Sequence, residues 1–186
     1  MSDTVGFWKL AQSEPDRLAI ADGGGREVTY GELLADANRL VHGLRALGLQ
    51  PGDVIASVLP NRAEMFALYF AAMQAGWYLT PINHHLVGPE IAYIVADSEA
   101  AVLVSDERFA DACAAAAAEV SLAEDRCFSI GTVAGHRPFT ELTAGQPDEL
   151  PGNRAAGAPI PRSRRRWPAP AVRLSRRAPP RARCRY

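Results

Sequence analysis

The stretch Asp-Val-Ile-Ala-Ser-Val-Leu at positions 53–59 decides the fold class. It is nearly continuous apolar sequence, which is typical of a strand that is covered on both faces of a sheet. The run at 62–75 is apolar on almost every side, so we expect a helix that is buried rather than lying at the surface. A further short apolar stretch at 77–80 predicts another strand. Strand, helix and strand in this order indicate an α/β layer.

Residues at the ends of these elements act as start and stop signals. Asn61 is expected to cap the helix, with Glu64 three positions later as in a capping box. Gly76 is positioned to end the helix, and Pro81 to stop the strand that follows.

Strands and helices continue to alternate as far as residue 142. Pro89 stands at a first-turn position, where the amide that proline lacks is not needed, and so starts a helix at 89–96. The pattern then predicts a strand at 101–104, a helix at 106–120, a strand at 126–130 and a short helix at 138–142. We therefore expect an α/β fold with a layered, mostly parallel sheet and helices on both faces.

Two short strands are predicted before this region, at 18–21 and 27–30, after an apolar helix at 5–11. The Asp-Gly-Gly-Gly sequence at 22–25 between them is rich in residues that accept positive φ, which predicts a hairpin turn. A glycine cluster can also bind phosphate, but that arrangement requires a helix directly after the glycines. A strand-like run follows instead, so we favour the hairpin.

The clearest helix begins after Thr29. The Thr29 hydroxyl can accept a hydrogen bond from the amide of Glu32, and the Glu32 carboxylate can accept one from the amide of Thr29, which together make a capping box. Gly48 can end the helix in the left-handed conformation, with Pro51 just beyond. The apolar residues between these ends recur with a 3.6-residue period, at Leu33, Leu34, Ala37, Leu40, Val41, Leu44 and Leu47.

The composition changes abruptly near residue 158. All 21 acidic residues of the 186-residue chain lie between Met1 and Glu149, and residues 1–157 carry ten basic residues. Residues 158–186 contain no acidic residue and no lysine, but ten arginines and six prolines. Such sequence has too few aliphatic side chains to offset the ~1–2 kcal/mol per residue that ordering a backbone costs. We expect one folded domain over 1–157 and a disordered basic tail over 158–186.

The tail has two interpretations. A basic arm on an acidic body is typical of proteins that bind nucleic acid or anionic lipid, and Arg-Arg-Arg-Trp at 164–167 could neutralise phosphates and stack on a base. However, the tail contains no lysine, and its mixture of Arg, Pro, Ala and Ser is what GC-rich coding DNA gives when read in the wrong frame. We therefore favour a frameshift near residue 158 and do not expect the tail to bind nucleic acid.

Cysteine usage and hydropathy predict a soluble, cytoplasmic chain. Cys113, Cys127 and Cys184 have no zinc-ribbon or disulfide spacing, so we expect buried or incidental thiols in a reducing compartment. No cationic stretch followed by an apolar core opens the chain, so no secretory signal is expected. The longest apolar region, at 65–79, is shorter than the ~20 residues of a membrane-spanning helix.

No group of residues points clearly to catalysis or metal binding, so we expect no catalytic, cofactor-binding or metal site in this chain. His84 and His85 point to opposite faces of an extended segment and lack a third ligand, so we place them at the surface or the core edge. No nucleophile-elbow motif and no Walker-type phosphate loop occur. Four acidic residues are assigned to helix termini, where first-turn acids suit the helix dipole: Asp97, Glu99, Asp106 and Glu107.

Two motifs resemble core motifs of the AMP-forming acyl-CoA synthetase and adenylation superfamily. The first motif is Val-Thr-Tyr-Gly-Glu-Leu at 28–33, followed by Ala37, Leu40, Leu44 and Gly48. The second is Met-Gln-Ala-Gly-Trp-Tyr-Leu-Thr-Pro-Ile-Asn at 73–83, where a helix end leads into a strand that ends in proline and a polar residue. The resemblance covers about residues 1–157, and the stretch at 81–86 is most similar to fatty-acid and related carboxylate–CoA ligases.

The resemblance implies both a fold and an activity. Members of that family make an acyl-adenylate from a carboxylic or fatty acid and ATP with Mg²⁺, and then transfer the acyl group to CoA. Both motifs build the first subdomain of the family's N-terminal domain and are mainly structural. The family's phosphate-gripping loop is expected just after 158–160, where this chain continues Pro-Arg-Ser-Arg. The resemblance therefore carries no catalytic residue and no ligand for ATP, Mg²⁺ or CoA onto this chain.

We therefore expect a truncated fragment of an ATP-dependent, AMP-forming carboxylate–CoA ligase that is inactive alone. The alternative is a non-enzymatic acidic α/β module whose Arg-rich arm binds nucleic acid or anionic lipid. A third interpretation is a protein that pairs with a separately encoded remainder of the enzyme. A lone first subdomain would also expose the apolar faces that its neighbours normally cover.

Overall fold

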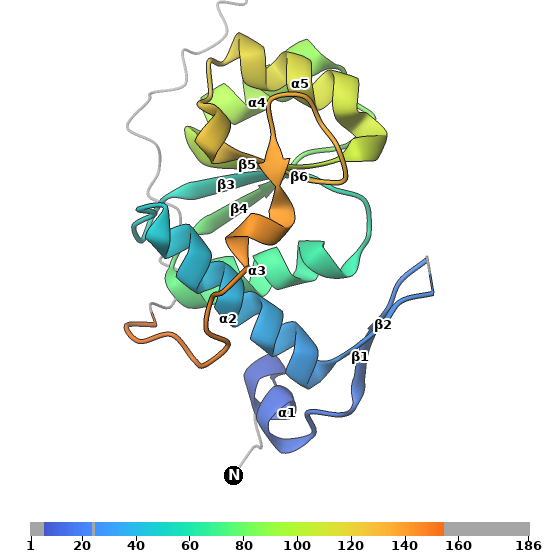
Figure 1. Ribbon diagram of the computed structural model, residues 1–186, viewed down its shortest axis with the longest axis vertical. Coiled ribbons are helices and arrows are strands. Elements are labelled where there is room, and N and C mark those ends of the chain that lie inside the picture. Colours follow the sequence, from blue (N-terminus) through green and yellow to red (C-terminus); the bar gives the residue numbers. More distant parts are fainter. Residues whose placement is uncertain (1–5, 24, 155–186) are drawn as a thin grey trace, which may run out of the picture.

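The computed structural model describes residues 6–23 and 25–154 (Figure 1). A five-stranded sheet lies between two layers of helices, and a two-stranded hairpin projects from one end. The tail predicted at 158–186, with Cys184, lies outside the described residues. Within the described part, no helix combines the length and the hydropathy that crossing a bilayer requires.

A short helix and a hairpin open the chain, and both were predicted. Helix α1 (Phe7–Ser13) precedes β1 (Leu18–Ala21) and β2 (Glu27–Thr29). The two strands pair antiparallel, and the Asp22 carboxylate accepts a hydrogen bond from the amide of Arg26 at 3.0 Å across the turn. The glycine-rich sequence is therefore flanked by paired strands, as the hairpin prediction requires.

Helix α2 (Tyr30–Ala46) has the predicted capping box. The Thr29 hydroxyl accepts from the amide of Glu32 at 3.2 Å, and the Glu32 carboxylate accepts from the amide of Thr29 at 2.8 Å. Gly48 has a φ of +92°, so the chain leaves the helix through the left-handed conformation that glycine tolerates. Both ends of α2 are thus set by local sequence.

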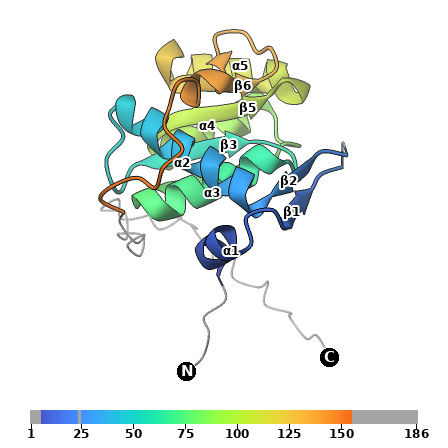
Figure 2. The ribbon, with the colours of Figure 1, turned by 60° about the horizontal axis from the view of Figure 1, so that its bottom comes forward.

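The five strands of the main sheet are all parallel, which confirms the predicted class. Their order is β4-β3-β5-β6-β7, and Figure 2 shows β3, β5 and β6 following one another. The last strand has only two residues, too few for a period-two pattern, which is why the sequence did not predict it. The strands are β3 (Val54–Val58), β4 (Tyr78–Pro81), β5 (Ala100–Asp106), β6 (Cys127–Ile130) and β7 (Arg137–Pro138).

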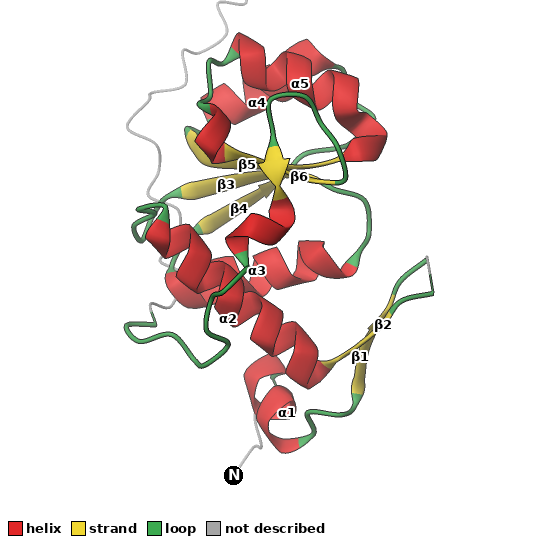
Figure 3. Ribbon diagram, viewed as in Figure 1, coloured by secondary structure: helices red, strands yellow, loops and turns green. Residues whose placement is uncertain are grey.

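Three more α-helices cross between the strands (Figure 3): α3 (Ala63–Ala75), α4 (Gly88–Asp97) and α5 (Ala110–Glu119). The helix predicted over 106–120 is divided, because Asp106 ends β5 and its side chain caps a 3₁₀ turn that precedes α5. The last predicted helix is also a 3₁₀ turn. The three such turns are η1 (Glu107–Phe109), η2 (Glu124–Arg126) and η3 (Phe139–Leu142).

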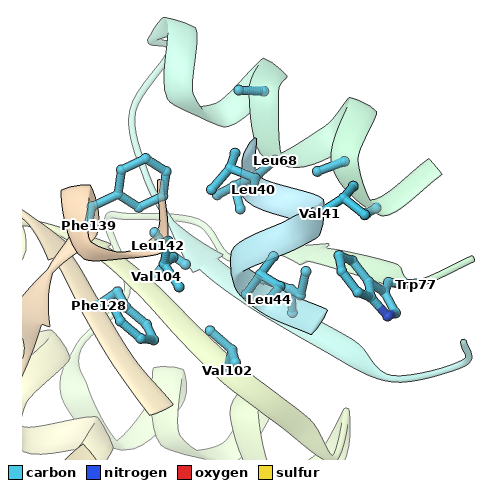
Figure 4. Packing of buried hydrophobic residues seen from close by; sticks show 14 of the residues in the cluster. Leu40, Val41, Leu44, Leu68, Trp77, Val102, Val104, Phe128, Phe139 and Leu142 are labelled. Atoms are coloured by element: carbon cyan, nitrogen blue, oxygen red, sulfur yellow. The ribbon is translucent and has the colours of Figure 1, made fainter. Parts of the chain in front are cut away.

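The sheet buries both of its faces. Helices α2 and α3 pack together on one face, and α4 and α5 on the other (Figures 1 and 2). Side chains alternate between the two cores: Val102 and Val104 contact the α2–α3 side, whereas Leu103 contacts the α4–α5 side. Phe128 and Leu44 fill the centre of the larger core (Figure 4). This is why the strands are almost entirely apolar in sequence.

One contact in the larger core depends on the absence of a side chain. Gly43 of α2 lies directly against the backbone of η3, and a Cβ at this position would overlap the carbonyl oxygen of Leu142. Leu142 and Phe139 can therefore reach the core beside α2 (Figure 4).

Two predictions about α3 are wrong. Its N-cap is Arg62 and not Asn61, and no side chain caps the helix, because a guanidinium has only donors and cannot accept from the first helix amides; it binds Glu64 instead. The helix is also not buried all round. Phe66 and Tyr69 lie at the surface of the described fold.

Candidate functional site

The strand order reverses between β3 and β5, since β4 lies on one side of β3 and β5 on the other. In open α/β sheets, ligands bind in the crevice outside the carboxyl ends of the strands at such a point. Arg62 follows β3, and Asp106 ends β5, so both lie at this edge. This edge is the first candidate site.

An ionic cluster of Arg26, Arg62, Glu64, Asp106 and Arg108 occupies the edge. Asp106 is only 1% exposed, and its carboxylate binds the Arg62 guanidinium at 2.6 Å and that of Arg108 at 3.0 Å. Glu64 binds Arg62 at 2.7 Å and Arg26 at 2.9 Å. The cluster therefore ties the end of β5 to the start of α3 and to the hairpin.

Its electrostatics favour a structural role. Burial acts to raise the pKa of Asp106, but hydrogen bonds from Arg108 and Arg62 outweigh burial and leave that pKa below its ordinary value. Burial also opposes ionisation of Glu64, and hydrogen bonding to Arg62 again leaves its pKa lowered. Such carboxylates are weak bases at neutral pH, and their partners are arginines, so the cluster is suited to fixing elements rather than to moving protons.

An apolar groove of about 800 Å³ opens beside the ionic cluster. We call it the α1–α3 groove, because α1, the hairpin and α3 form its walls. The rings of Phe7 and Phe70 stack across its floor, with centroids 3.6 Å apart. Asn61 and Arg62 line the end next to the cluster. Its other apolar lining includes Leu10, Ile20, Tyr30, Leu33 and Phe66.

The two histidines lie at the core edge and the surface, as predicted, but they do not point to opposite faces: both lie in a turn, and their ring centroids are 4.3 Å apart. His84 is half-buried and stacks on the ring of Phe109 at 4.7 Å, while His85 is exposed. Among residues 6–23 and 25–154, no group of three or more histidines, cysteines and acids is close enough together to hold a metal ion.

Cys113 and Cys127 are free thiols buried on the α4–α5 side of the sheet. Burial raises the pKa of Cys113 to about 12 and that of Cys127 to about 11. Both are therefore neutral at pH 7 and unsuited to nucleophilic attack.

The assignment of the four acids to helix termini is confirmed for Asp97, Asp106 and Glu107, but only two of the four lie at a helix start, where acids suit the dipole. Asp106 caps η1 and Glu107 lies in its first turn, as predicted. Asp97, however, is the last residue of α4, and Glu99 follows that helix with a φ of +54°, so neither favours a helix dipole. The prediction also missed the arginine partners of Asp106. Their signal was present, because residues that follow neighbouring parallel strands meet at one edge of the sheet.

A segment that we call the strap, residues 148–154, runs along α2. The Asn38 side chain donates to the carbonyl oxygen of Asp148 at 2.7 Å, and the Arg45 guanidinium donates to that of Gly152 at 2.8 Å. Helix α2 therefore fixes the path of the chain up to the last residues that the structure describes.

Comparisons with known proteins agree with this fold. The family model described as AMP-binding enzyme matches residues 7–167. A feruloyl-CoA synthase from Amycolatopsis sp. is 39% identical over 116 residues, which make up 61% of this chain and 23% of that protein. A 3-hydroxybenzoate–CoA ligase from Aromatoleum sp. (strain CIB) is 32% identical over 147 residues, 79% of this chain and 28% of that protein.

A solved structure of another protein has a similar fold. Apo MatB from Rhodopseudomonas palustris is 30% identical and has a TM-score of 0.65, over 82% of this chain and 30% of that chain. The chain thus spans less than a third of each of these three proteins. The match starts in α1, includes all five strands and the strap, and ends inside the Arg-rich tail. The chain belongs to the AMP-binding enzyme family, and residues 6–23 and 25–154 have the fold of the N-terminal subdomain of its CoA ligases.

Proposed function

We propose that this chain is the N-terminal segment of an AMP-forming carboxylate–CoA ligase and does not activate an acid by itself. The observation that carries the proposal is the family match over residues 7–167, in a chain that spans only 23% and 28% of two CoA-ligase relatives. Their names support a carboxylic acid and CoA as substrates of the complete enzyme, and membership of the AMP-binding enzyme family supports ATP with Mg²⁺ as the further reactant.

The charges of the described residues support a scaffolding role. Adenylation requires cations placed against the ATP phosphates and an acid that holds Mg²⁺. Here Arg62 and Arg108 both bind the buried Asp106, and Arg26 binds Glu64. Each of these arginines is already paired with a carboxylate, so gripping a triphosphate would first require breaking the ionic cluster. We assign phosphate binding and catalysis to sequence that continues the domain.

We further propose that the reading frame is shifted near residue 158. The change in composition supports this, since ten arginines and no acidic residue follow it. Read in the other two frames past codon 158, the coding DNA is expected to encode a loop rich in Ser, Thr and Gly with a lysine. If neither frame encodes such a loop, the frameshift is wrong.

The activity test pairs the chain with the missing sequence. If a downstream reading frame exists, we expect it to restore acid-dependent ATP–pyrophosphate exchange when it is co-expressed with this chain. Ferulate, 3-hydroxybenzoate and a long-chain fatty acid are suitable test acids, because relatives are named for such substrates. A soluble pair that exchanges pyrophosphate with none of them contradicts the proposal.

The charge asymmetry favours a second candidate function, an α/β module whose Arg-rich arm binds nucleic acid or anionic lipid. Such binding depends on phosphate neutralisation and should weaken steeply as salt is added. Failure to bind any polyanion at low ionic strength removes this candidate. Under either function we propose a cytoplasmic location, in keeping with the free thiols of Cys113 and Cys127.

A further inference from the structure

The outer side of α3 carries a continuous apolar stripe. The exposed positions of this helix are Phe66, Tyr69 and Met73, which are 44%, 47% and 40% exposed. Spacings of three and four residues place them on one side of the helix. We call these three residues the α3 stripe. No charged residue interrupts it.

The α3 stripe continues into the α1–α3 groove. Phe66 belongs to both, and Phe70, one turn further along, forms part of the groove floor. In both Figures 1 and 2, α1 and the hairpin lie on the α2–α3 side of the molecule, away from α4 and α5. Monomeric proteins rarely leave a contiguous apolar surface open, so the continuity of the α3 stripe with the groove indicates an occupant.

The chain leaves the described region at the edge of this surface. The guanidinium of Arg154 lies 5.2 Å from the ring of Trp8, and Trp8 packs edge-on against Phe70 at 5.8 Å. The hydrogen bonds between α2 and the strap fix this exit. Sequence that continues the domain therefore starts beside the groove.

The opposite helical layer has a different outer side. The exposed positions of α4 include Glu90 and Asp97 together with Tyr93, and those of α5 include Asp111 and Glu119. Charged residues at these positions are typical of a side that faces water. The α4–α5 layer is therefore the matched control surface.

We propose that the α3 stripe and the α1–α3 groove are the docking surface for the polypeptide that follows this segment in complete AMP-binding enzymes. This inference rests on the proposed function. In MatB, 70% of the chain lies outside the matched part, which is ample for a partner surface. The partner presents mainly apolar side chains, because the charges at the groove's end are already paired within the ionic cluster.

The experiment is co-purification. The 186-residue chain, tagged, is co-expressed with the part of MatB that follows its matched segment. The wild-type chain is expected to retain this polypeptide in a 1:1 complex. The double variant Phe66→Asp/Tyr69→Asp is expected to retain it at least about tenfold more weakly, because a charge would be buried at the interface. The control variant Val87→Asp/Tyr93→Asp, at the N-cap and on the outer side of α4, is expected to retain it as the wild type does.

Circular dichroism and cooperative urea unfolding establish that each variant is folded. Absence of a wild-type complex, or a complex that the α4 variant loses and the α3 variant keeps, overturns the proposal.

The competing occupants are a second copy of this chain and its own residues 155–186. Light scattering is expected to show a monomer, and a dimer that the α3 variant abolishes means that a second copy is the occupant. Hydroxyl-radical footprinting is expected to modify Tyr69 and Met73 in the free chain and to leave them protected in the complex. Protection in the free monomer assigns the surface to residues 155–186 and overturns the proposal.

Pyrophosphate exchange by the purified complex is measured separately. A complex that assembles through the α3 stripe but exchanges no pyrophosphate leaves the docking surface standing and counts against the proposed function. A pair that exchanges pyrophosphate but assembles equally well with the α3 variant supports the proposed function and overturns the docking surface.

Discussion

The two helical layers of this molecule are alike on the inside and different on the outside. Toward the sheet, both bury aliphatic side chains completely, such as Leu68 of α3 and Ile91 of α4. Away from the sheet, α3 exposes only large apolar residues, whereas α4 exposes Tyr93 between carboxylates and α5 exposes carboxylates. The inner sides explain how the segment folds, and the outer sides indicate which layer lies inside a larger enzyme.

The first prediction tests the similarity of the inner sides and has the largest expected effect. Leu68→Ala and Ile91→Ala should each lower the free energy of unfolding by about 2–5 kcal/mol, because both side chains are fully buried and leave a cavity. Urea denaturation of the 186-residue chain measures both values. A cost below about 1 kcal/mol at either position would mean that this layer does not pack against the sheet as described.

The second prediction concerns the ionic cluster that joins the α3 layer to the sheet. The folded-state pKa of Asp106 is lowered, so its contribution to stability is complete above its unfolded value of 3.8 and is lost as the pH falls through the folded pKa. Asp106→Asn should lower the free energy of unfolding by about 1–3 kcal/mol at pH 7. It should make little difference well below the carboxyl pKa.

Urea midpoints for the wild type and Asp106→Asn, taken from neutral to acidic pH, measure this difference. The two curves are expected to converge as the pH falls. Parallel curves would show that the carboxylate of Asp106 is not held by Arg62 and Arg108 in solution.

The third prediction tests the close contact between α2 and η3. Gly43→Ala should destabilise the fold by about 1–3 kcal/mol, since the new methyl group would overlap the Leu142 carbonyl oxygen. Ala46→Gly, at an exposed position of the same helix, is the control and should cost about 1 kcal/mol through helix propensity alone. A Gly43→Ala chain that is more stable than the wild type contradicts the contact.

The smallest expected effect on stability comes from substitutions on the outer sides of the two layers. Here the layers should differ instead in how much of the dye ANS they bind. Tyr69→Glu on α3 and Tyr93→Glu on α4 should each change the free energy of unfolding by less than about 1 kcal/mol. Tyr69→Glu should reduce binding of the dye ANS to the free chain by about half, because it interrupts the α3 stripe. Equal dye binding by both variants would show that the outer side of α3 is no more apolar than that of α4.

Much of the fold could be predicted because its signals are local. The capping box of Thr29 and Glu32, the hairpin turn and the apolar strands each depend on residues close together in sequence. Where the prediction failed, a tertiary contact decided the outcome. Arg62 replaces Asn61 as the N-cap of α3, since its guanidinium is held by Glu64 and Asp106.

The candidate site was less accessible to sequence reasoning. The sequence showed that α3 is apolar on nearly all sides, but could not show which side the sheet covers. Phe66 and Tyr69 became identifiable as a surface only once the sheet and α2 were in place. Arg26 reaches Glu64 across 38 positions of sequence, a distance at which composition and spacing carry no signal.

In the function proposed above, this segment is a scaffold, and its catalytic partners lie in the sequence that continues the domain. Acid-dependent ATP–pyrophosphate exchange by the purified 186-residue chain, with no other polypeptide present, tests it most directly. We predict no exchange above the protein-free blank with ferulate, 3-hydroxybenzoate or a long-chain fatty acid. Exchange that depends on one of these acids and persists through purification would show that the segment activates an acid by itself.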